Sequence, residues 1–283
     1  MRTVITYRIQ TIREVRDALS EGRLFAAYQP IVRIDTAQIV GVEALVRMRT
    51  PEGRIVSADQ FHEAISDPRI GNNLTVQMLS QVTTDVRAWL DNGISLQHVC
   101  INVAGTDFQK SGLEERIVEK FAAANIPIEH VILEINETVF MGGYDNHVAR
   151  AAENLRAKGM RVALDDFGTG HASLTHLIDF PVDIIKIDKT FVGRMIEDRR
   201  SLAIVEGLIE AALKLDVERN CSHPVFVGIH ELPLADSPSF RPPPLPQTML
   251  MLLANALLLA GSFPIGRVGA ASSLDPFSNR RLG

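Results

Sequence analysis

Polar side chains that could hold a metal ion or act on a phosphate recur at the ends of short apolar runs in this chain. Runs such as "GVEALVR", "INVAG", "LEINET", "RVALDDFG" and "IIKIDK" each carry a carboxylate, an amide or an ammonium group. Two adjacent carboxylates at the end of an apolar run repel each other and resist burial unless a positive charge lies nearby. The residues that share this placement are Glu43, Asn102, Glu134, Asp165, Asp166, Lys186 and Asp188.

A divalent cation would remove the electrostatic cost of gathering these carboxylates at one place. An all-oxygen ligand set favours Mg²⁺, Mn²⁺ or Ca²⁺ over Zn²⁺. The adjacent Asp165 and Asp166 could serve two neighbouring ions, which is the arrangement used for in-line displacement at phosphorus. The placement on successive runs therefore indicates a metal centre for phosphoryl chemistry.

Each of these residues also has a structural interpretation when it is considered alone. A single acidic residue at a strand end commonly caps a helix or pairs with a base. Lys186 could form a structural ion pair with Glu137 or Asp188. The histidines lack zinc-ligand spacing, and the chain contains neither a P-loop nor a dinucleotide fingerprint.

Strands and helices that alternate from about residue 22 to 217 must position these side chains. We expect strands at 25–32 and 39–48, joined by a turn around Asp35, and further strands at 98–104, 130–138, 161–168 and 182–192. We expect helices at 57–65 with Ser57 as the cap, at 73–93 with Gly93 as the stop, and at 107–126, 146–159, 172–180 and 199–215.

This alternation predicts an α/β fold with a parallel sheet. About six strands in this length suit a (β/α)8-type, TIM-like barrel that is incomplete after the sixth strand, and a doubly wound open sheet is the alternative. In both folds functional residues gather at the carboxyl ends of the strands, where the polar residues named above would meet.

Composition narrows the class of protein. The chain has 283 residues, 46% of them hydrophobic and 22% charged, as in a globular domain. A net charge of −5 gives no basic face for a nucleic-acid polymer. Cys100 and Cys221 do not suggest a disulfide framework, and no signal-peptide stretch is present, so we expect a cytoplasmic protein.

The character of the chain changes after about residue 217. Nine of the 14 prolines lie in 218–283, and no lysine follows Lys214. One possible strand, "PVFVGI", remains, and the apolar stretch 249–260 is too short to span a membrane. We expect a proline-rich tail with one short apolar segment, and a membrane association is not expected.

Six motifs make the chain resemble the EAL family of cyclic di-GMP phosphodiesterases over about residues 18 to 217. They are "YQPIV" (28–32), "GVEALVR" (41–47), "INV" (101–103), "LEINET" (133–138), "ALDDFGTGHASL" (163–174) and "VDIIKIDKTFV" (182–192). The resemblance implies a (β/α)8-type barrel that hydrolyses cyclic di-GMP to linear pGpG with Mg²⁺ or Mn²⁺. It also implies a homodimer, with the loop after the double aspartate coupling ligand binding to dimerisation.

The resemblance also implies a role for each site residue. It assigns Lys186 to the attacking water, Gln29 and Arg47 to the substrate, and Glu137 to anchoring the loop after the double aspartate. Departures within the motifs are small: Asn136 replaces the usual threonine, and Ala104 and Gly105 follow Asn102 where serine is common. The ligands implied for the first metal are Glu43, Asn102, Glu134 and Asp165; Asp166 is shared with a second metal, and Asp188 belongs to the metal cluster.

A larger departure follows the sixth strand. The family places a seventh strand ending in "AEGVE" and then a "QG" motif, whereas residues 215–232 read "LDVERNCSHPVFVGIHEL". The domains expected are therefore an extension at 1–17, an EAL-type barrel at 18–217 that is truncated relative to the family, and a divergent tail at 218–283. We interpret the abrupt change as a frameshift or an equivalent replacement.

Two functions follow from this pattern. The first is a cyclic di-GMP phosphodiesterase whose activity is reduced or lost, because the second metal lacks a ligand. The second is a catalytically silent module that binds cyclic di-GMP or a partner protein. A membrane-tethered scaffold is a third alternative, and it depends only on the apolar segment of the tail.

Overall fold

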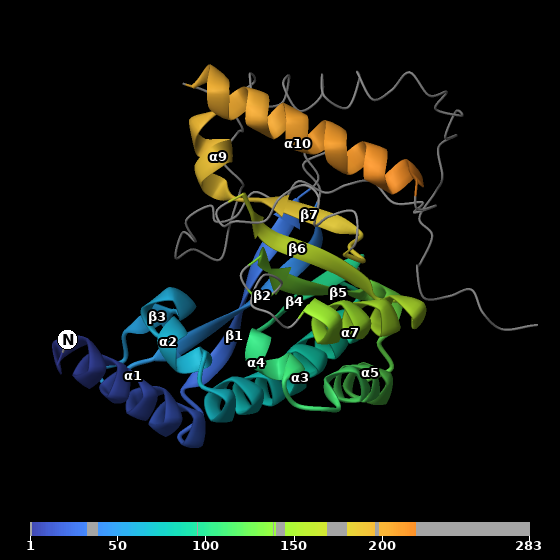
Figure 1. Ribbon diagram of the computed structural model, residues 1–283. Helices are drawn as coiled ribbons and strands as arrows, with labels where there is room; N and C mark the ends of the chain where they lie inside the picture. Colours follow the sequence, from blue (N-terminus) through green and yellow to red (C-terminus); the bar gives the residue numbers. More distant parts are fainter. Residues whose placement is uncertain are drawn as a thin grey trace, which may run out of the picture.

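The computed structural model describes residues 2–32, 39–94, 96–137, 139, 145–168, 180–195 and 198–218 (Figure 1). Its strands are β1 (Leu24–Val32), β2 (Ile39–Arg49), β3 (Ile55–Ser57), β4 (His98–Val103), β5 (Val131–Asn136), β6 (Arg161–Phe167) and β7 (Ile184–Ile187). Its α-helices are α1 (Arg2–Ser20), α2 (His62–Ile65), α3 (Pro68–Asp91), α4 (Gly105–Phe108), α5 (Leu113–Ala123), α7 (Asp145–Ala157), α9 (Lys189–Arg194) and α10 (Arg199–Glu218). Two 3-10 turns, η1 (Ala58–Gln60) and η2 (Ile128–His130), precede α2 and β5.

The strands form one sheet whose order follows the sequence. The order is β1-β2-β4-β5-β6-β7, and β3 pairs with the outer part of β2. β1 and β2 are antiparallel, and every later neighbour along this path is parallel. A doubly wound sheet reverses its strand order at a switch point, and this sheet does not within the described residues. The predicted α/β barrel-type fold is therefore confirmed.

Side chains of alternate residues separate the two faces of the sheet. On β4 and β5, every second side chain packs against α3, α5 and α7 in the main hydrophobic core. Ile101 and Leu133 of the strands belong to this core, together with Val82, Phe121 and Leu155 of the helices. These helices cover that face of the sheet in Figure 1. The side chains on this outer face of the sheet therefore serve packing, and only the side chains on the inner face are available for function.

The inner face of the sheet carries a second, smaller layer of buried residues. Cys100, Ile132, Ala163 and Ile184 pack together, each on a different parallel strand, with Ile31 of β1 against them. Because strand side chains alternate, the next inner position lies two residues further along each strand. Those four positions are Asn102, Glu134, Asp165 and Lys186.

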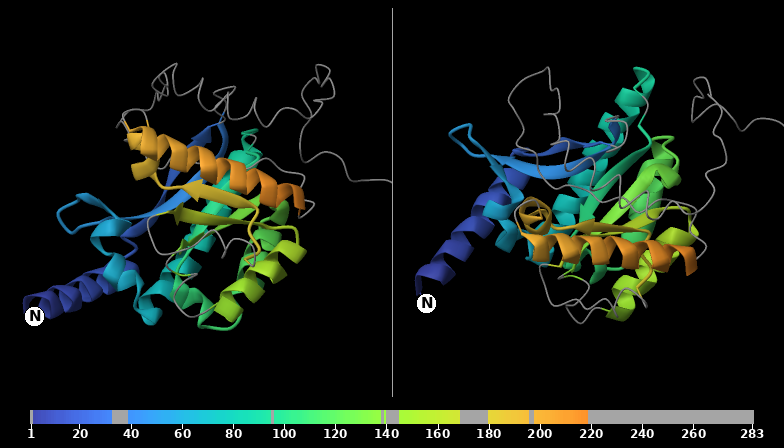
Figure 2. Two further views of the ribbon diagram at one scale, coloured as in Figure 1. Left: turned by 45° about the horizontal axis from the view of Figure 1, so that its top comes forward. Right: turned by 90° about the horizontal axis from the view of Figure 1, so that it is seen from above.

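Helices flank both outer strands of the sheet. On α3, the Gln81 side chain accepts a hydrogen bond from the backbone N–H of Ala26 at 3.0 Å, and Gln77 Nε2 donates to the carbonyl of Leu24 at 2.9 Å. These glutamines satisfy β1 groups that β2 does not pair. Beside β7, Ile187 packs with Met195 and Val205, where α9 and α10 lie along the other side of the molecule (Figure 2).

Several predicted elements differ from the structure in extent. The strand predicted at 182–192 ends at Ile187, because the side chain of Asp188 accepts a hydrogen bond from the backbone N–H of Thr190 and so begins α9. The helix predicted at 107–126 is divided into α4 and α5, since Gly112 has a φ of 88°. Ser57 precedes η1 but makes no side-chain cap, whereas Asp67 caps α3.

Other expectations are extended by the structure or lie outside its described part. Helix α1 was not predicted; it crosses the proposed boundary at residue 18 and buries Val15 and Ala18. The turn around Asp35, the helix at 172–180 except its last residue, and the tail from 219 lie outside the described residues. Among the described helices, none combines the length and apolar run that a bilayer crossing requires.

Replacing Gly41 by alanine is expected to destabilise the barrel. A Cβ at this inner position of β2 would lie 2.5 Å from the carbonyl oxygen and from the ring of His98 on β4. Overpacking of this kind typically costs about 1–3 kcal/mol. Urea denaturation would measure the free energy of unfolding.

Gly207→Ala is the matched control for this substitution. Gly207 lies in α10 with nothing within 4 Å of an added Cβ, so alanine there should be neutral or stabilising. Equal effects of the two substitutions would contradict the close packing of Gly41 against His98.

Candidate metal centre at the carboxyl ends of the strands

Three buried carboxylates from three strands surround the ammonium group of Lys186. Lys186 Nζ lies 2.9 Å from Glu43 Oε2, 2.9 Å from Glu134 Oε2 and 3.2 Å from Asp165 Oδ1. The three residues that carry these carboxylates are at most 5% exposed. The sequence prediction that residues of separate apolar runs meet at one rim is borne out for these four side chains.

Burial and mutual repulsion make this cluster electrostatically demanding. Desolvation, followed by repulsion from Glu43, raises the pKa of Glu134 to about 8, although Lys186 opposes the rise. Burial alone would lower the pKa of Lys186, but attraction to Glu134, Glu43 and Asp165 raises it above its ordinary value. The ammonium therefore stays charged and supplies the cation that the carboxylates require.

Two amide residues border the cluster. Asn102, at the end of β4, donates from Nδ2 to Glu43 Oε1 at 3.0 Å. Gln29 of β1 lies directly opposite Glu43 in the antiparallel register, so both residues lie on the same face of the β1–β2 pair. The structure thus brings the predicted residues Asn102 and Gln29 beside the carboxylates.

The double aspartate leaves β6 in an irregular turn. In a regular strand, adjacent side chains point to opposite faces, so Asp166 would point away from the cluster. Asp166 instead has a φ of 55°, and the pairing of β6 with β7 shifts register between Leu164 and Phe167. Asp166 Oδ2 accepts a hydrogen bond from Asn136 Nδ2 at 2.8 Å, so its carboxylate lies at the carboxyl end of β5.

Glu137 holds the backbone that follows the double aspartate. Its side chain is 1% exposed, and Oε2 accepts a hydrogen bond from the backbone N–H of Gly168 at 3.0 Å. Gly168 has a φ of 101°, a region that favours glycine. The contact is the anchoring implied for Glu137, while its contribution to catalysis stays a prediction.

Two further predicted site residues have hydrogen-bond partners outside the carboxylate cluster. Arg47 lies on the same face of β2 as Glu43 but four residues further on, about 13 Å along the strand, and its Nη1 donates to the Val46 carbonyl at 3.0 Å. Asp188 is buried, and its Oδ1 accepts from both the backbone N–H and the hydroxyl of Thr190. Asp188 thus acts as a helix cap, and its metal role stays a prediction.

The cluster fits a divalent cation by its donor atoms. One carboxylate oxygen each from Glu43, Glu134 and Asp165 lies within 4.8 Å of the other two. Glu134 Oε1 is buried and accepts no hydrogen bond within the described residues. Carboxylate oxygens with a neighbouring amide are the ligands that Mg²⁺, Mn²⁺ and Ca²⁺ prefer.

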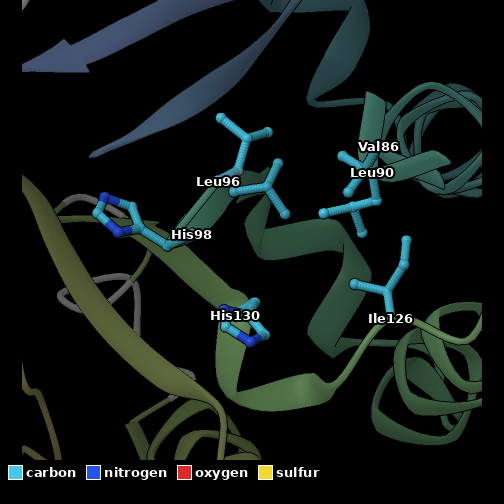
Figure 3. Close-up of a pocket in the computed structure, with 7 residues that line it drawn as sticks. Val86, Leu90, Leu96, His98, Ile126 and His130 are labelled. Atoms are coloured by element: carbon cyan, nitrogen blue, oxygen red, sulfur yellow. The ribbon is translucent and has the colours of Figure 1, made fainter. Parts of the chain in front are cut away.

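A small apolar cavity lies at the opposite end of β4. Figure 3 shows residues that line it: Leu96 lies between His98 and the side chains of Val86 and Leu90, and the ring of His98 points away from them. Burial lowers the pKa of His98 to about 4, so its ring is neutral near pH 7. Because His98 begins β4 whereas Asn102 lies near its end, this cavity is separate from the carboxylate cluster.

Comparison with known proteins agrees with the carboxylate-lined barrel. The sequence model of the EAL domain matches residues 12–221, which is most of the chain. The chain belongs to the EAL domain family. The resemblance carried by the six sequence motifs is thereby confirmed, and the match ends close to residue 217, where the composition changes.

Curated relatives of this EAL domain include two proteins of Pseudomonas aeruginosa. "Bifunctional diguanylate cyclase/cyclic di-GMP phosphodiesterase MucR" is 28% identical over 211 residues, covering 75% of this chain and 31% of that protein. "Cyclic di-GMP phosphodiesterase NbdA" is 27% identical over 213 residues, covering 75% of this chain and 27% of that protein. The chain therefore spans less than a third of the length of either relative.

A solved structure supports the same fold. "PaMucR Phosphodiesterase, c-di-GMP complex" superposes with a TM-score of 0.67 and 28% sequence identity, covering 73% of this chain and 83% of that chain. The barrel-type architecture is thus shared with an EAL domain whose structure contains cyclic di-GMP.

Asn136 was not among the predicted site residues. Its sequence signal was its position, two residues after Glu134 and therefore on the same face of β5. The hydrogen bond to Asp166 depends on the irregular turn of β6, which no spacing rule reveals.

Replacing Lys186 by methionine is expected to make stability depend on divalent metal. Removal of one partner from a buried ion-pair cluster costs about 3–5 kcal/mol, because the remaining charges lose compensation. With a chelator present, Lys186→Met should melt well below the unmodified protein, and Mn²⁺ should raise its melting temperature more than that of the unmodified protein. Thermal melts with and without Mn²⁺ measure both effects.

Lys158→Met is the control, because Lys158 is exposed and lies outside the cluster. It should leave the melting temperature and its response to Mn²⁺ unchanged. If Lys186→Met is as stable as the unmodified protein in chelator, the ammonium is not the counter-ion of the cluster.

The pH dependence of stability should report Glu134. Because its pKa is raised from an ordinary 4.5 to about 8, the folded protein binds a proton that the unfolded chain releases, and stability is lost as pH rises through this window. In chelator, the unfolding free energy of Glu134→Gln minus that of the unmodified protein should increase between pH 5 and 8, by at most about 1.4 kcal/mol per pH unit. Denaturation curves at four pH values provide the measurement, and a difference independent of pH would contradict the raised pKa.

Proposed function

We propose that this domain is a metal-dependent phosphodiesterase that hydrolyses cyclic di-GMP to linear pGpG. The observation that carries the proposal is the convergence of Glu43, Glu134 and Asp165, each from a different strand, around Lys186 of a fourth strand. Membership of the EAL family and relatives named as cyclic di-GMP phosphodiesterases support the choice of substrate.

The chain's own residues divide the work of the reaction. Glu43, Asn102, Glu134 and Asp165 would hold one Mg²⁺ or Mn²⁺ ion, and Asp166 would contribute to a second. Such ions polarise phosphoryl oxygens and lower the pKa of bound water. Lys186, held by the carboxylates, would orient the attacking water and stabilise negative charge that develops on the phosphate.

The remaining predicted residues would contact the substrate or support the backbone around the carboxylate cluster. Gln29, opposite Glu43, and Arg47, further along β2, would contact the nucleotide, with Arg47 making a charge-assisted contact to a phosphate oxygen. Glu137 would keep the loop after the double aspartate in place through the N–H of Gly168. Asp188 would support the cluster from the start of α9.

We also propose that turnover is reduced or lost in this chain. The "AEGVE" and "QG" motifs, which the family resemblance assigns to the second metal and the attacking water, do not occur in residues 215–283, and the family match ends at residue 221. A two-metal mechanism that lacks a ligand on the water side loses orders of magnitude in rate. The same observation favours the second candidate, a catalytically silent module that binds cyclic di-GMP or a partner protein.

Two further properties belong to this proposal. We place the protein in the cytoplasm, where cyclic di-GMP would reach it, and we expect a homodimer that forms through the barrel. Sedimentation with and without cyclic di-GMP would test the dimer.

Hydrolysis and binding should be measured on the same preparation. We expect calorimetry to detect cyclic di-GMP binding, and chromatography to detect slow pGpG formation that requires Mg²⁺ or Mn²⁺ and stops with chelator. Glu43→Gln should abolish the hydrolysis, because it removes a carboxylate of the cluster.

The outcomes separate the candidates. Binding without turnover would replace the enzyme by the binding module, and turnover at an undiminished rate would contradict the role assigned to the downstream motifs. Absence of both binding and turnover would reject the enzyme and the cyclic di-GMP-binding module, and only a module that binds a partner protein would remain. Lys158→Met, exposed and remote from the cluster, is the control for altered surface charge.

A further inference from the structure

The side chain of Asn136 contacts the second aspartate of the double-aspartate turn directly. Asn136 is the last residue of β5, and its Nδ2 donates to Asp166 Oδ2 at 2.8 Å. In the strand register the Cα of Asn136 lies opposite Asp165, so the amide reaches one residue further along β6, to Asp166. Both side chains are half-buried.

The backbone alone holds Asp166 weakly in this orientation. Its φ of 55° lies in the left-handed region, which costs free energy for a residue that has a Cβ, although aspartate tolerates it better than most. The ladder between β6 and β7 is also interrupted at this residue. A residue with a strained backbone and no pairing to the next strand keeps one conformation only where contacts of its side chain determine it.

Two adjacent residues at the end of β5 divide this task. Glu137 accepts a hydrogen bond from the backbone N–H of Gly168 and so holds the main chain after the turn. Asn136 bonds the carboxylate itself and so orients the functional group. The two contacts are separable by mutation, because one involves backbone and the other a side chain.

We propose that Asn136 is a positioning residue that orients the Asp166 carboxylate for a divalent cation. The inference rests on the proposed function, since it assumes that Asp166 serves a metal; the oxygen-rich cluster beside it fits such an ion. Outer hydrogen-bond partners of metal ligands typically change metal affinity by about 10- to 100-fold when they are removed.

Threonine and valine at position 136 provide a matched pair of variants. They have nearly the same shape, and only threonine retains a hydroxyl that can donate to Asp166. We expect Asn136→Thr to keep Mn²⁺ affinity within about twofold of the unmodified protein and Asn136→Val to weaken it about tenfold. Electron paramagnetic resonance of free Mn²⁺ measures both affinities without requiring turnover. Asn136→Leu is a second variant without the donor if Asn136→Val does not fold.

A double-mutant cycle with Asp166→Asn distinguishes positioning from a general structural effect. If Asn136 acts through the Asp166 carboxylate, Asn136→Val should weaken Mn²⁺ binding only while Asp166 is present. Equal weakening in the Asp166→Asn background, or unchanged affinity in Asn136→Val, would overturn the inference.

The metal measurement separates this inference from the proposed function. If the protein binds Mn²⁺ but does not hydrolyse cyclic di-GMP, the enzymatic function is rejected, and the Mn²⁺ affinities of the variants still test the role of Asn136. If the Asp166→Asn variant binds Mn²⁺ with full affinity, Asp166 does not serve the metal. The inference on Asn136 is then rejected as well.

Discussion

Burial of three carboxylates around one ammonium group is the interaction on which the architecture of this domain depends. Glu43, Glu134 and Asp165 come from different strands and are at most 5% exposed, so their mutual repulsion acts in a medium of low dielectric constant. Lys186 compensates this charge from a fourth strand. Strands that are far apart in sequence must therefore keep a fixed register, because a shift of one residue would turn each carboxylate into the apolar layer beneath the helices.

Register and parity explain why the cluster lies where it does. The inner layer of Cys100, Ile132, Ala163 and Ile184 fills the barrel with apolar side chains immediately below the charged positions. The side chains on the other face of the sheet pack against α3, α5 and α7. The charged side chains are thus confined to one end of the inner face of the sheet. The apolar cavity beside His98 lies at the other end of β4.

The turn at Asp165 and Asp166 resolves the problem of two adjacent carboxylates at a strand end. Asp165 keeps the regular alternation and points to Lys186, whereas Asp166 leaves it through a left-handed backbone conformation. Asn136, the last residue of β5, then holds the side chain of Asp166, and the adjacent Glu137 holds the following backbone. The two adjacent carboxylates thereby contact different partners, Lys186 for Asp165 and Asn136 for Asp166.

The amino-acid pattern was sufficient for the fold class and for most of the cluster, whereas the strand order that excludes a doubly wound sheet came from the folded structure. Apolar runs that end in polar residues, together with the rule that functional residues gather at the carboxyl ends of parallel strands, placed Glu43, Asn102, Glu134, Asp165 and Lys186 at one rim. Element ends were less predictable: Asp188 stops a strand that its apolar neighbours would continue, because its side chain caps the next helix. Gly112 divides a predicted helix for a different local reason, its φ of 88°.

Only the tertiary structure decided how these side chains pair. Spacing left Lys186 with Glu137 or Asp188 as alternative partners, whereas the folded sheet brings it to Glu43, which is 143 residues away in sequence. The orientation of Asp166 depends on a backbone angle and on an amide from the neighbouring strand. Alternation along a strand is a local property that the sequence by itself determines, while contacts between strands depend on a register set by the packing of the whole sheet.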